Sequence, residues 1–224
     1  MKLNQNTQDI LKNFSLINTN ILIKEGTELS TISTMRNIFA KATITESFEK
    51  EFGVYDLNQF LAVVSSTNKP ELKLEDKFMT ISAEGSKSKV KYFYSDPSVI
   101  VAPTKEVNMP EADVTFNLTE SNLKELLKMA AILATPDLAL VGEKGGDVVL
   151  KVCDKKNDTS NNFDIVVGEN ATADYTFYFK VENLKMMSGN YDVSVSSKSI
   201  SHFQNTKLPI QYWIALEPDS TISK

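Results

Sequence analysis

The chain of 224 residues carries the same order of structural signals twice, and this internal repeat constrains its fold more than any other feature. Each half opens with a segment whose apolar residues recur at helical spacing. The fragment DILK at 9–12 aligns with ELLK at 125–128, an offset of 116 positions. Thr119 stands before the second segment, where its side-chain oxygen can cap a helix by accepting a backbone N–H. The apolar stripes consist of Thr7, Ile10, Leu11, Phe14 and Ile17 in the first half and Leu123, Leu126, Leu127 and Ala130 in the second. The sequence therefore predicts an amphipathic helix at the start of each half.

Segments of β-strand character follow each predicted helix, and a second short helix interrupts them. The second helices are expected at 55–66 and 179–189, where Phe60 aligns with Leu184. Glycines in the turns supply the positive φ that tight hairpins need. The strands are expected at 21–24, 37–44 and 90–97, and at 138–141, 148–153 and 210–218, with Gly26 and the pair Gly145-Gly146 in turns. Each half thus reads as helix, strands, helix, strands.

The repeat predicts an α+β protein of two similar domains, at 1–95 and 112–224. Between them, a linker at 96–111 contains Pro97, Pro103 and Pro110, so we expect it to be extended and outside both sheets. The alternative is one α+β domain whose halves resemble each other by chance. The ending EPDSTISK, at 217–224, is polar and is expected to be mobile.

Composition excludes several classes of protein. No apolar run reaches about 18 residues, so no membrane span is expected, and the polar start MKLNQNTQDILKNF lacks the apolar core of a secretion signal. A single cysteine, Cys153, permits no intrachain disulfide and fits a reducing cytosol. The net charge of −5 argues against a nucleic-acid binder, unless positive charge gathers on one surface or the protein encloses its DNA.

The sequence offers no convincing catalytic or metal site. Its only histidine, His202, has no neighbouring acid that the sequence can identify as an orienting partner. Cys153 lies in the run VVLKVCD and reads as a small strand hydrophobe. The glycine-rich GEKGGD at 142–147 reads as a hairpin turn, and the motifs of phosphate-binding loops, zinc sites and EF-hands are missing from the sequence. We expect no enzyme activity, no metal and no cofactor.

Several fragments, none of them catalytic, carry a family resemblance through their joint order along the chain. They are the opening MKLNQNTQDILKNFSLINTNILIKEG, YDLNQFL at 55–61, DPSVIVAP at 96–103, LKMMSGNY at 184–191 and ALEPDST at 215–221. In them the chain resembles the DNA polymerase sliding clamps, or processivity factors, of T-even-type bacteriophages, which are part of the PCNA-like clamp family. The resemblance covers nearly the whole sequence.

The resemblance implies a specific assembly and function. Three subunits would close into a ring, with two helices of each domain on the inner wall and the antiparallel sheets outside. An ATP-dependent clamp loader would place the homotrimer around duplex DNA, where it would tether the replicative DNA polymerase without reading sequence. A role in late transcription and a location in the cytoplasm of the infected bacterium are implied as well. By the family geometry, edge strands of neighbouring subunits would pair head to tail.

Lysines on the predicted helices are the candidate DNA-facing residues. Lys12 and Lys128 occupy matching repeat positions away from the apolar stripe, and Lys124 lies one helical turn before Lys128. Asp9 and Glu125 on the same helices weaken this interpretation, although carboxylates suit the N-terminal halves of helices. The alternative is that these lysines are ordinary solvated positions. The full candidate set is Lys2, Lys12, Lys124, Lys128 and Lys185.

Apolar residues of the linker and of the last strand form a candidate pocket for partner peptides, in the region where the family resemblance places one. Trp213 beside small apolar residues would make a reasonable anchor. The alternative is that Trp213 belongs to the core of the last strand, alternating with Tyr212. The candidate residues are Val99, Ile100, Val101, Pro103, Trp213, Ala215 and Pro218.

A structural ring-forming phage protein, such as a tail or baseplate component without a DNA role, is the alternative function. Such a protein needs neither paired helices with matching lysines nor an apolar linker. Both features occur in this sequence, and they favour the clamp.

Overall fold

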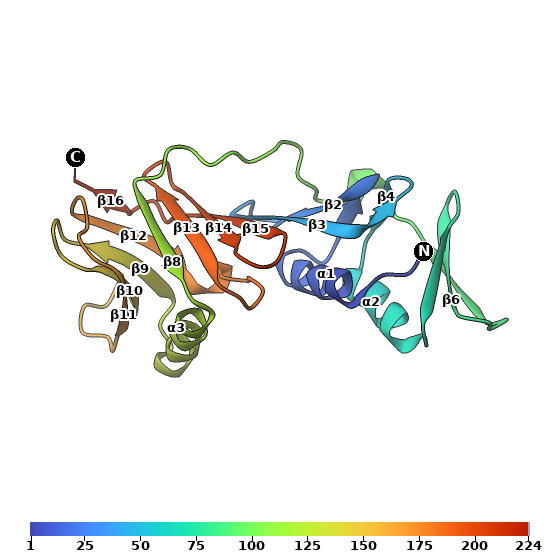
Figure 1. Ribbon diagram of the computed structural model, residues 1–224, viewed down its shortest axis with the longest axis horizontal. Helices are drawn as coiled ribbons and strands as arrows, with labels where there is room; N and C mark the ends of the chain where they lie inside the picture. Colours follow the sequence, from blue (N-terminus) through green and yellow to red (C-terminus); the bar gives the residue numbers. More distant parts are fainter. Residues whose placement is uncertain (224) are drawn as a thin grey trace. The chain divides into compact units, whose positions relative to one another are not determined.

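A computed structural model describes residues 1–223, and the chain divides into two compact units at 1–106 and 107–224. Both units combine helices with antiparallel sheets, as Figure 1 shows. Lys224, the last residue of the predicted second domain, lies outside the described residues. The boundary between the units falls inside the predicted linker at 96–111.

Unit 1 contains two helices, α1 (Gln5–Ile17) and α2 (Leu57–Ser66), which pack against each other. Asn4 and Asp56 cap them, because each side chain accepts a hydrogen bond from a backbone N–H of the first turn. Strand β1 pairs with β4, β2 with β3, and β6 lies between β5 and β7, all antiparallel. The strands are β1 (Ile21–Ile23), β2 (Gly26–Ile32), β3 (Ile38–Phe48), β4 (Phe52–Val54), β5 (Pro70–Leu74), β6 (Phe78–Ala83) and β7 (Lys89–Phe93).

Unit 2 contains one α-helix in its described residues, α3 (Glu120–Leu133), which Thr119 caps as the sequence predicted. One sheet has the strand order β11-β10-β9-β12-β16, and in the other β13 and β14 connect β8 to β15. The strands are β8 (Val114–Leu118), β9 (Asp137–Gly142), β10 (Val148–Cys153), β11 (Phe163–Gly168), β12 (Tyr175–Lys180), β13 (Tyr191–Ser196), β14 (Ile200–Asn205), β15 (Ile210–Ala215) and β16 (Thr221–Ile222).

The two amphipathic helices bury equivalent positions, which confirms the predicted stripes. Ile10 and Phe14 of α1 are buried, and so are Leu126 and Ala130 at the same repeat positions of α3. The predicted hairpin at 142–147 is confirmed as well, because β9 and β10 pair across it and Gly145 has a φ of 81°. Gly26 also has a positive φ, but β1 and β2 pair with other strands and form no hairpin together.

The prediction of a second helix at 179–189 is wrong. Strand β12 continues to Lys180, and a single 3-10 turn, η2 (Val181–Asn183), replaces the helix. Two tyrosines outside the segment, Tyr191 at the start of β13 and Tyr212 in β15, explain the difference. The Tyr212 hydroxyl accepts a hydrogen bond from Met187 N at 3.1 Å, and the Tyr191 hydroxyl donates one to Met187 O at 2.5 Å. These bonds satisfy backbone groups that a helix would have paired internally.

The predicted linker begins with a short turn and is not extended throughout. Asp96 caps the 3-10 turn η1 (Pro97–Val99), with its carboxylate accepting a bond from Ser98 N at 2.8 Å. Just before it, Ser95 forms an isolated β-bridge with Gly53. The start of this segment is therefore fixed to unit 1 by local capping and by one bridge.

Candidate nucleic-acid and partner interfaces

The helix lysines lie on the exposed faces of α1 and α3. Lys12, Lys124 and Lys128 are all exposed, opposite the buried stripes of their helices. Lys124 forms an ion pair with Glu120 one turn earlier, and an exposed pair of this kind contributes less than about 1 kcal/mol. Within residues 1–223, no ion pair involves Lys12 or Lys128. These three ammonium groups are thus accessible to an anionic ligand.

The other two candidate lysines lie off the α-helices. Lys2 precedes α1, and its Nζ lies 3.3 Å from Glu84 and 3.4 Å from Glu71. Hydrogen bonds to Glu84 and then to Glu71 raise the pKa of Lys2, so its charge is balanced within unit 1. Lys185 is exposed and follows η2 in a segment without regular structure. The structure therefore places Lys124 and Lys128 on one helical face, whereas Lys2 and Lys185 lie on no α-helix.

The linker part of the candidate pocket is anchored through its backbone. Val101 N donates to Asn20 Oδ1 at 3.0 Å, and Val101 O accepts from Asn18 Nδ2 at 3.2 Å. Asn18 Nδ2 also donates to the carbonyl of Ile32, at the end of β2. Val99 is exposed, Ile100 is buried and Pro103 is half-buried. Unit 1 thus presents one free apolar side chain, Val99, on an otherwise fixed segment.

Sequence reasoning missed an exposed tip at the turn between β2 and β3. Met35 is 82% exposed, and beside it stands Arg36, the only arginine of the sequence, with a φ of 56°. The Ser33 hydroxyl builds the turn by accepting from the backbone N–H groups of Asn37 and Ile38 at 3.1 Å. The available signal was an apolar residue next to the only arginine, after the polar pair Ser33-Thr34 and before Asn37.

The C-terminal part of the candidate pocket belongs to unit 2. Trp213 in β15 is only 8% exposed, and its ring stacks on His202 at 4.6 Å between centroids. This burial agrees with the alternative that Trp213 is a core residue, and its role as a peptide anchor stays a prediction. Ala215 is half-buried and Pro218 is exposed.

Neither of the two residues with potential catalytic chemistry has a reactive environment. Burial lowers the pKa of His202, and a hydrogen bond to Gln211, at 2.9 Å, opposes that shift. Burial, followed by the charge of Asp137, raises the pKa of the Cys153 thiol, and a protonated thiol is a poor nucleophile. No group of three or more His, Cys, Asp or Glu in residues 1–223 is arranged to hold a metal ion. No helix in the same range is long and apolar enough to cross a membrane.

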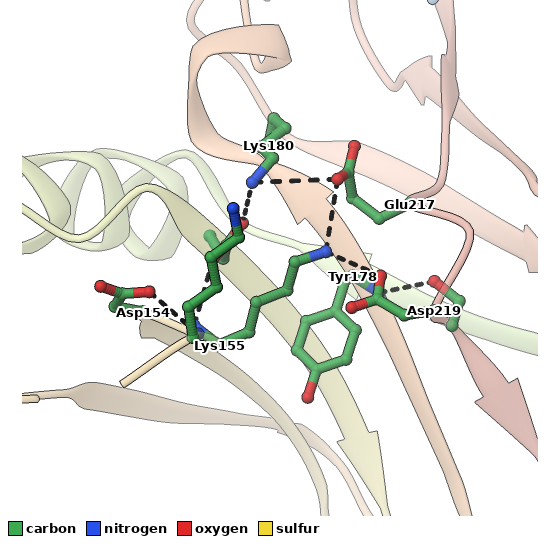
Figure 2. A network of polar contacts seen from close by, with 9 residues as sticks. Asp154, Lys155, Tyr178, Lys180, Glu217 and Asp219 are labelled. Carbon is green, nitrogen blue, oxygen red and sulfur yellow. Dashed lines mark hydrogen bonds and ion pairs between the residues drawn. The ribbon is translucent and has the colours of Figure 1, made fainter. Parts of the chain in front are cut away.

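The C-terminal segment, which the sequence predicted to be mobile, is fastened to unit 2. Lys155 Nζ lies 2.7 Å from Asp219 and 3.3 Å from Glu217, and above the ring of Tyr178 at 5.1 Å (Figure 2). Lys180 Nζ lies 2.5 Å from the buried carboxylate of Asp137 and 3.8 Å from Glu217. Beyond this network β16 pairs with β12. Lysines on two separate segments, Lys155 and Lys180, therefore hold the tail, which polarity alone did not reveal.

Each unit also has an edge strand with exposed apolar residues. Strand β7 is the outer strand of its sheet, and Val90 and Phe93 are exposed on it. Strand β11 is the outer strand of the five-stranded sheet, and Val166 is exposed there. Two lysines, Lys89 and Lys91, lie on β7, whereas β11 carries Asp164. Each edge thus exposes apolar side chains beside charged ones, and the charges on the two edges are opposite.

Comparison with known proteins assigns the family. A family model described as DNA polymerase processivity factor matches residues 3–102, and one described as gp45 sliding clamp, C terminal, matches residues 115–218. A sliding clamp of Vibrio phage KVP40 is 31% identical over 222 residues, covering 97% of this chain and 99% of the relative. The chain belongs to the sliding clamp family. The resemblance found in the sequence is therefore confirmed, and this clamp is a DNA polymerase processivity factor.

Further relatives extend this result. The sliding clamp of Enterobacteria phage T4 is 28% identical over 228 residues, with 99% of each chain covered. The clamp also resembles PCNA of A. fulgidus, solved with the C-terminal region of FEN-1, with a TM-score of 0.70 over 96% of each chain. At 14% identity this likeness concerns the fold alone, and it confirms the two-domain clamp fold. The family assignment decides against a purely structural tail or baseplate protein.

Proposed function

We propose that three copies of this clamp close into a ring around duplex DNA and tether the replicative polymerase during synthesis. An ATP-dependent clamp loader would open and place the ring, in the cytoplasm of an infected bacterium. The clamp itself would catalyse no reaction, because it acts by enclosure. Likeness to the T-even-type clamps leads us to include a role in late transcription.

The observation that carries the proposal is the exposed lysine at the same repeat position of both units. Lys12 lies on α1 and Lys128 lies on α3, two helices that differ in sequence, and each lysine lies opposite the buried stripe of its helix. A ring of three chains would present six such positions to one ligand. Phosphate contacts carry no sequence information, so DNA held this way remains free to slide. Enclosure also removes the difficulty of the net charge of −5, since retention then requires no tight grip.

The edge strands support closure of the ring. Strand β7 of one copy would pair with β11 of the next, because a free edge offers unpaired N–H and C=O groups to another strand. Burial of Val90, Phe93 and Val166 and attraction between Lys91 and Asp164 would stabilise that contact. Since β7 and β11 belong to different units, the contact is head to tail and repeats around a closed ring.

The partner site in the proposal includes two parts, one from each unit. The first is the apolar start of the linker, with Val99 exposed and Val101 fixed by two hydrogen bonds. The second is the end of the chain from β15 onward, with Ala215 and Pro218. A fixed backbone lowers the entropic cost of binding a peptide, which supports this region as the polymerase site.

The double substitution Lys124→Glu and Lys128→Glu tests the DNA-facing surface. We expect a trimer of normal mass by light scattering, with a strong loss of loader-dependent processive DNA synthesis. The control is Lys198→Glu with Lys207→Glu, which changes the charge equally at two exposed lysines outside the helices. Processivity that is unchanged by the helix substitutions would contradict a DNA-facing α3.

A further inference from the structure

Two exposed aliphatic residues occupy equivalent positions in the repeat. Leu16 on α1 is 62% exposed and Ile132 on α3 is 63% exposed. No other large apolar side chain on the α-helices of residues 1–223 is mostly exposed. They lie 116 positions apart, the same offset that relates Lys12 to Lys128. One exposed leucine needs no explanation, but an exposed aliphatic side chain at both repeat positions does.

The aliphatic residues belong to a longer surface pattern that both helices share. Leu16 follows Lys12 by four residues, and Ile132 follows Lys128 by four, so each pair shares one helical face. An acid stands three residues before each lysine, Asp9 on α1 and Glu125 on α3. All six residues are exposed, whereas the buried residue between them differs, Phe14 in α1 and Ala130 in α3. The exposed pattern is therefore retained where the core has changed, which points to a ligand that both units face.

The C-terminal ends of α1 and α3, which carry Leu16 and Ile132, are poor binding sites for phosphate. The C-terminal end of a helix carries a partial negative charge and usually favours Lys or Arg in its last turn. Neither α1 nor α3 has a basic residue there. Leu16 and Ile132 occupy the accessible positions instead, and an aliphatic side chain can donate no hydrogen bond to a phosphate oxygen. Ionic contact on each helix is thus confined to the lysines one or more turns earlier.

We propose that Leu16 and Ile132 are positioning residues for sliding. Across three chains they would face the duplex backbone at six places and contact it without binding phosphate. They keep phosphate binding away from the C-terminal turn of each helix, so that few ionic contacts break at each step along DNA. This inference rests on the proposed function, in which both helices line the hole. Duplex DNA is the occupant that fits, because each aliphatic residue lies one turn from an exposed lysine on the same helical face, and that lysine is suited to a phosphate.

Substitution of both residues by lysine is the decisive test. Trimers with Leu16→Lys and Ile132→Lys would be loaded on DNA, and their diffusion along stretched duplex would be recorded at several salt concentrations. We expect roughly tenfold slower diffusion at low salt, with a binding slope that steepens by about 0.9 in log K against log salt for each new phosphate contact. The matched control is Leu16→Ala with Ile132→Ala, which should slide like the natural chain.

Two reference outcomes separate this inference from the function on which it rests. Lys12→Gln with Lys128→Gln should flatten the salt slope if α1 and α3 face DNA at all. If it does so while the Leu16→Lys and Ile132→Lys trimer slides normally, the positioning role is overturned and the DNA-facing wall stands. If neither set changes sliding or salt dependence, the proposed wall itself is wrong. Loss of loading or polymerase binding in the alanine variant, with normal diffusion, would make these residues protein-docking contacts and overturn the inference.

Discussion

At the residue scale, the ion pair between Asp137 and Lys180 is the one in unit 2 whose loss we expect to cost the most stability. Asp137 is 1% exposed, and its carboxylate accepts from Lys180 Nζ at 2.5 Å and from Lys155 N at 3.2 Å. Removal of one partner from a buried ion pair leaves an uncompensated charge and typically costs about 3–5 kcal/mol. Because Lys180 is 27% exposed and Lys155 N still donates to Asp137, we expect Lys180→Ala to lower the free energy of unfolding by less than that, about 1–3 kcal/mol, as measured by urea denaturation at fixed protein concentration. Lys207→Ala, at an exposed lysine, serves as the control and should change it little.

The tail residue Asp219 should make a small part of the stability depend on pH. A hydrogen bond from Lys155 lowers the pKa of Asp219 below its ordinary value. A carboxylate whose pKa is lower in the folded state stabilises above its unfolded pKa, about 3.9, and this stabilisation is lost as pH falls through the folded-state pKa. Asp219→Asn should therefore cost less than about 1 kcal/mol near neutral pH, because the side chain is half exposed. Unfolding curves of the two proteins should converge in acid, and a constant difference down to low pH would contradict the assignment.

Residues whose partners are close in sequence were predictable, and residues whose partners are distant were not. Thr119 and the lysine faces follow from helical spacing alone, which requires no knowledge of the fold. Lys155 meets Asp219 across 64 residues of sequence, so neither composition nor spacing reveals that the tail is held. The same limit explains Trp213, whose burial depends on the strands that surround it.

At the element scale, the helix caps give a direct test of how the repeat begins. The Thr119 hydroxyl accepts from Asn122 N at 3.1 Å and satisfies one of the free N–H groups at the start of α3. Thr119→Ala should cost about 1 kcal/mol of stability, seen as a lower urea midpoint. Ser121→Ala, at an exposed position in the first turn that makes no cap, is the matched control. Equal effects of both substitutions would mean that the cap contributes nothing specific.

Element types were predictable where one periodicity dominates. The 3.6-residue pattern identified α1 and α3, and the turn glycines at 145–146 identified the hairpin between β9 and β10. The helix prediction for 179–189 failed because the apolar residues of this segment fit both a helix and a strand followed by a turn. The hydroxyls of Tyr191 and Tyr212 decide between them, and these residues belong to other strands. Tertiary contacts therefore override a weak local preference at this place.

At the scale of the whole molecule, an acidic chain that acts on DNA requires spatial separation of charge. Three chains of net charge −5 would repel DNA from most of their outer surface, which favours a bound state that depends on enclosure. In the proposed ring, the exposed faces of α1 and α3 would supply the cations that such a state needs, and their acids would balance them in part. Weak internal contact and external repulsion together suit a ring that slides and is loaded by another protein.

Ring closure through the edge strands is the assembly step on which the proposed function would depend. Val166→Lys places a charge at the apolar centre of β11, which in the proposed ring would face Lys89 and Lys91 of β7, so apolar burial would be lost and the attraction of Asp164 for Lys91 would be opposed. We expect the mass measured by light scattering to fall from about three times 25.0 kDa towards 25.0 kDa, with loss of processive synthesis. Thr172→Lys adds the same charge at an exposed position of unit 2 outside the strands and should leave the trimer intact. Because Val166 is half exposed in the single chain, its substitution should not unfold unit 2, and circular dichroism of the variant checks this. A Val166→Lys protein that remains a trimer would show that another surface closes the ring, and β7 with β11 would then have no part in assembly.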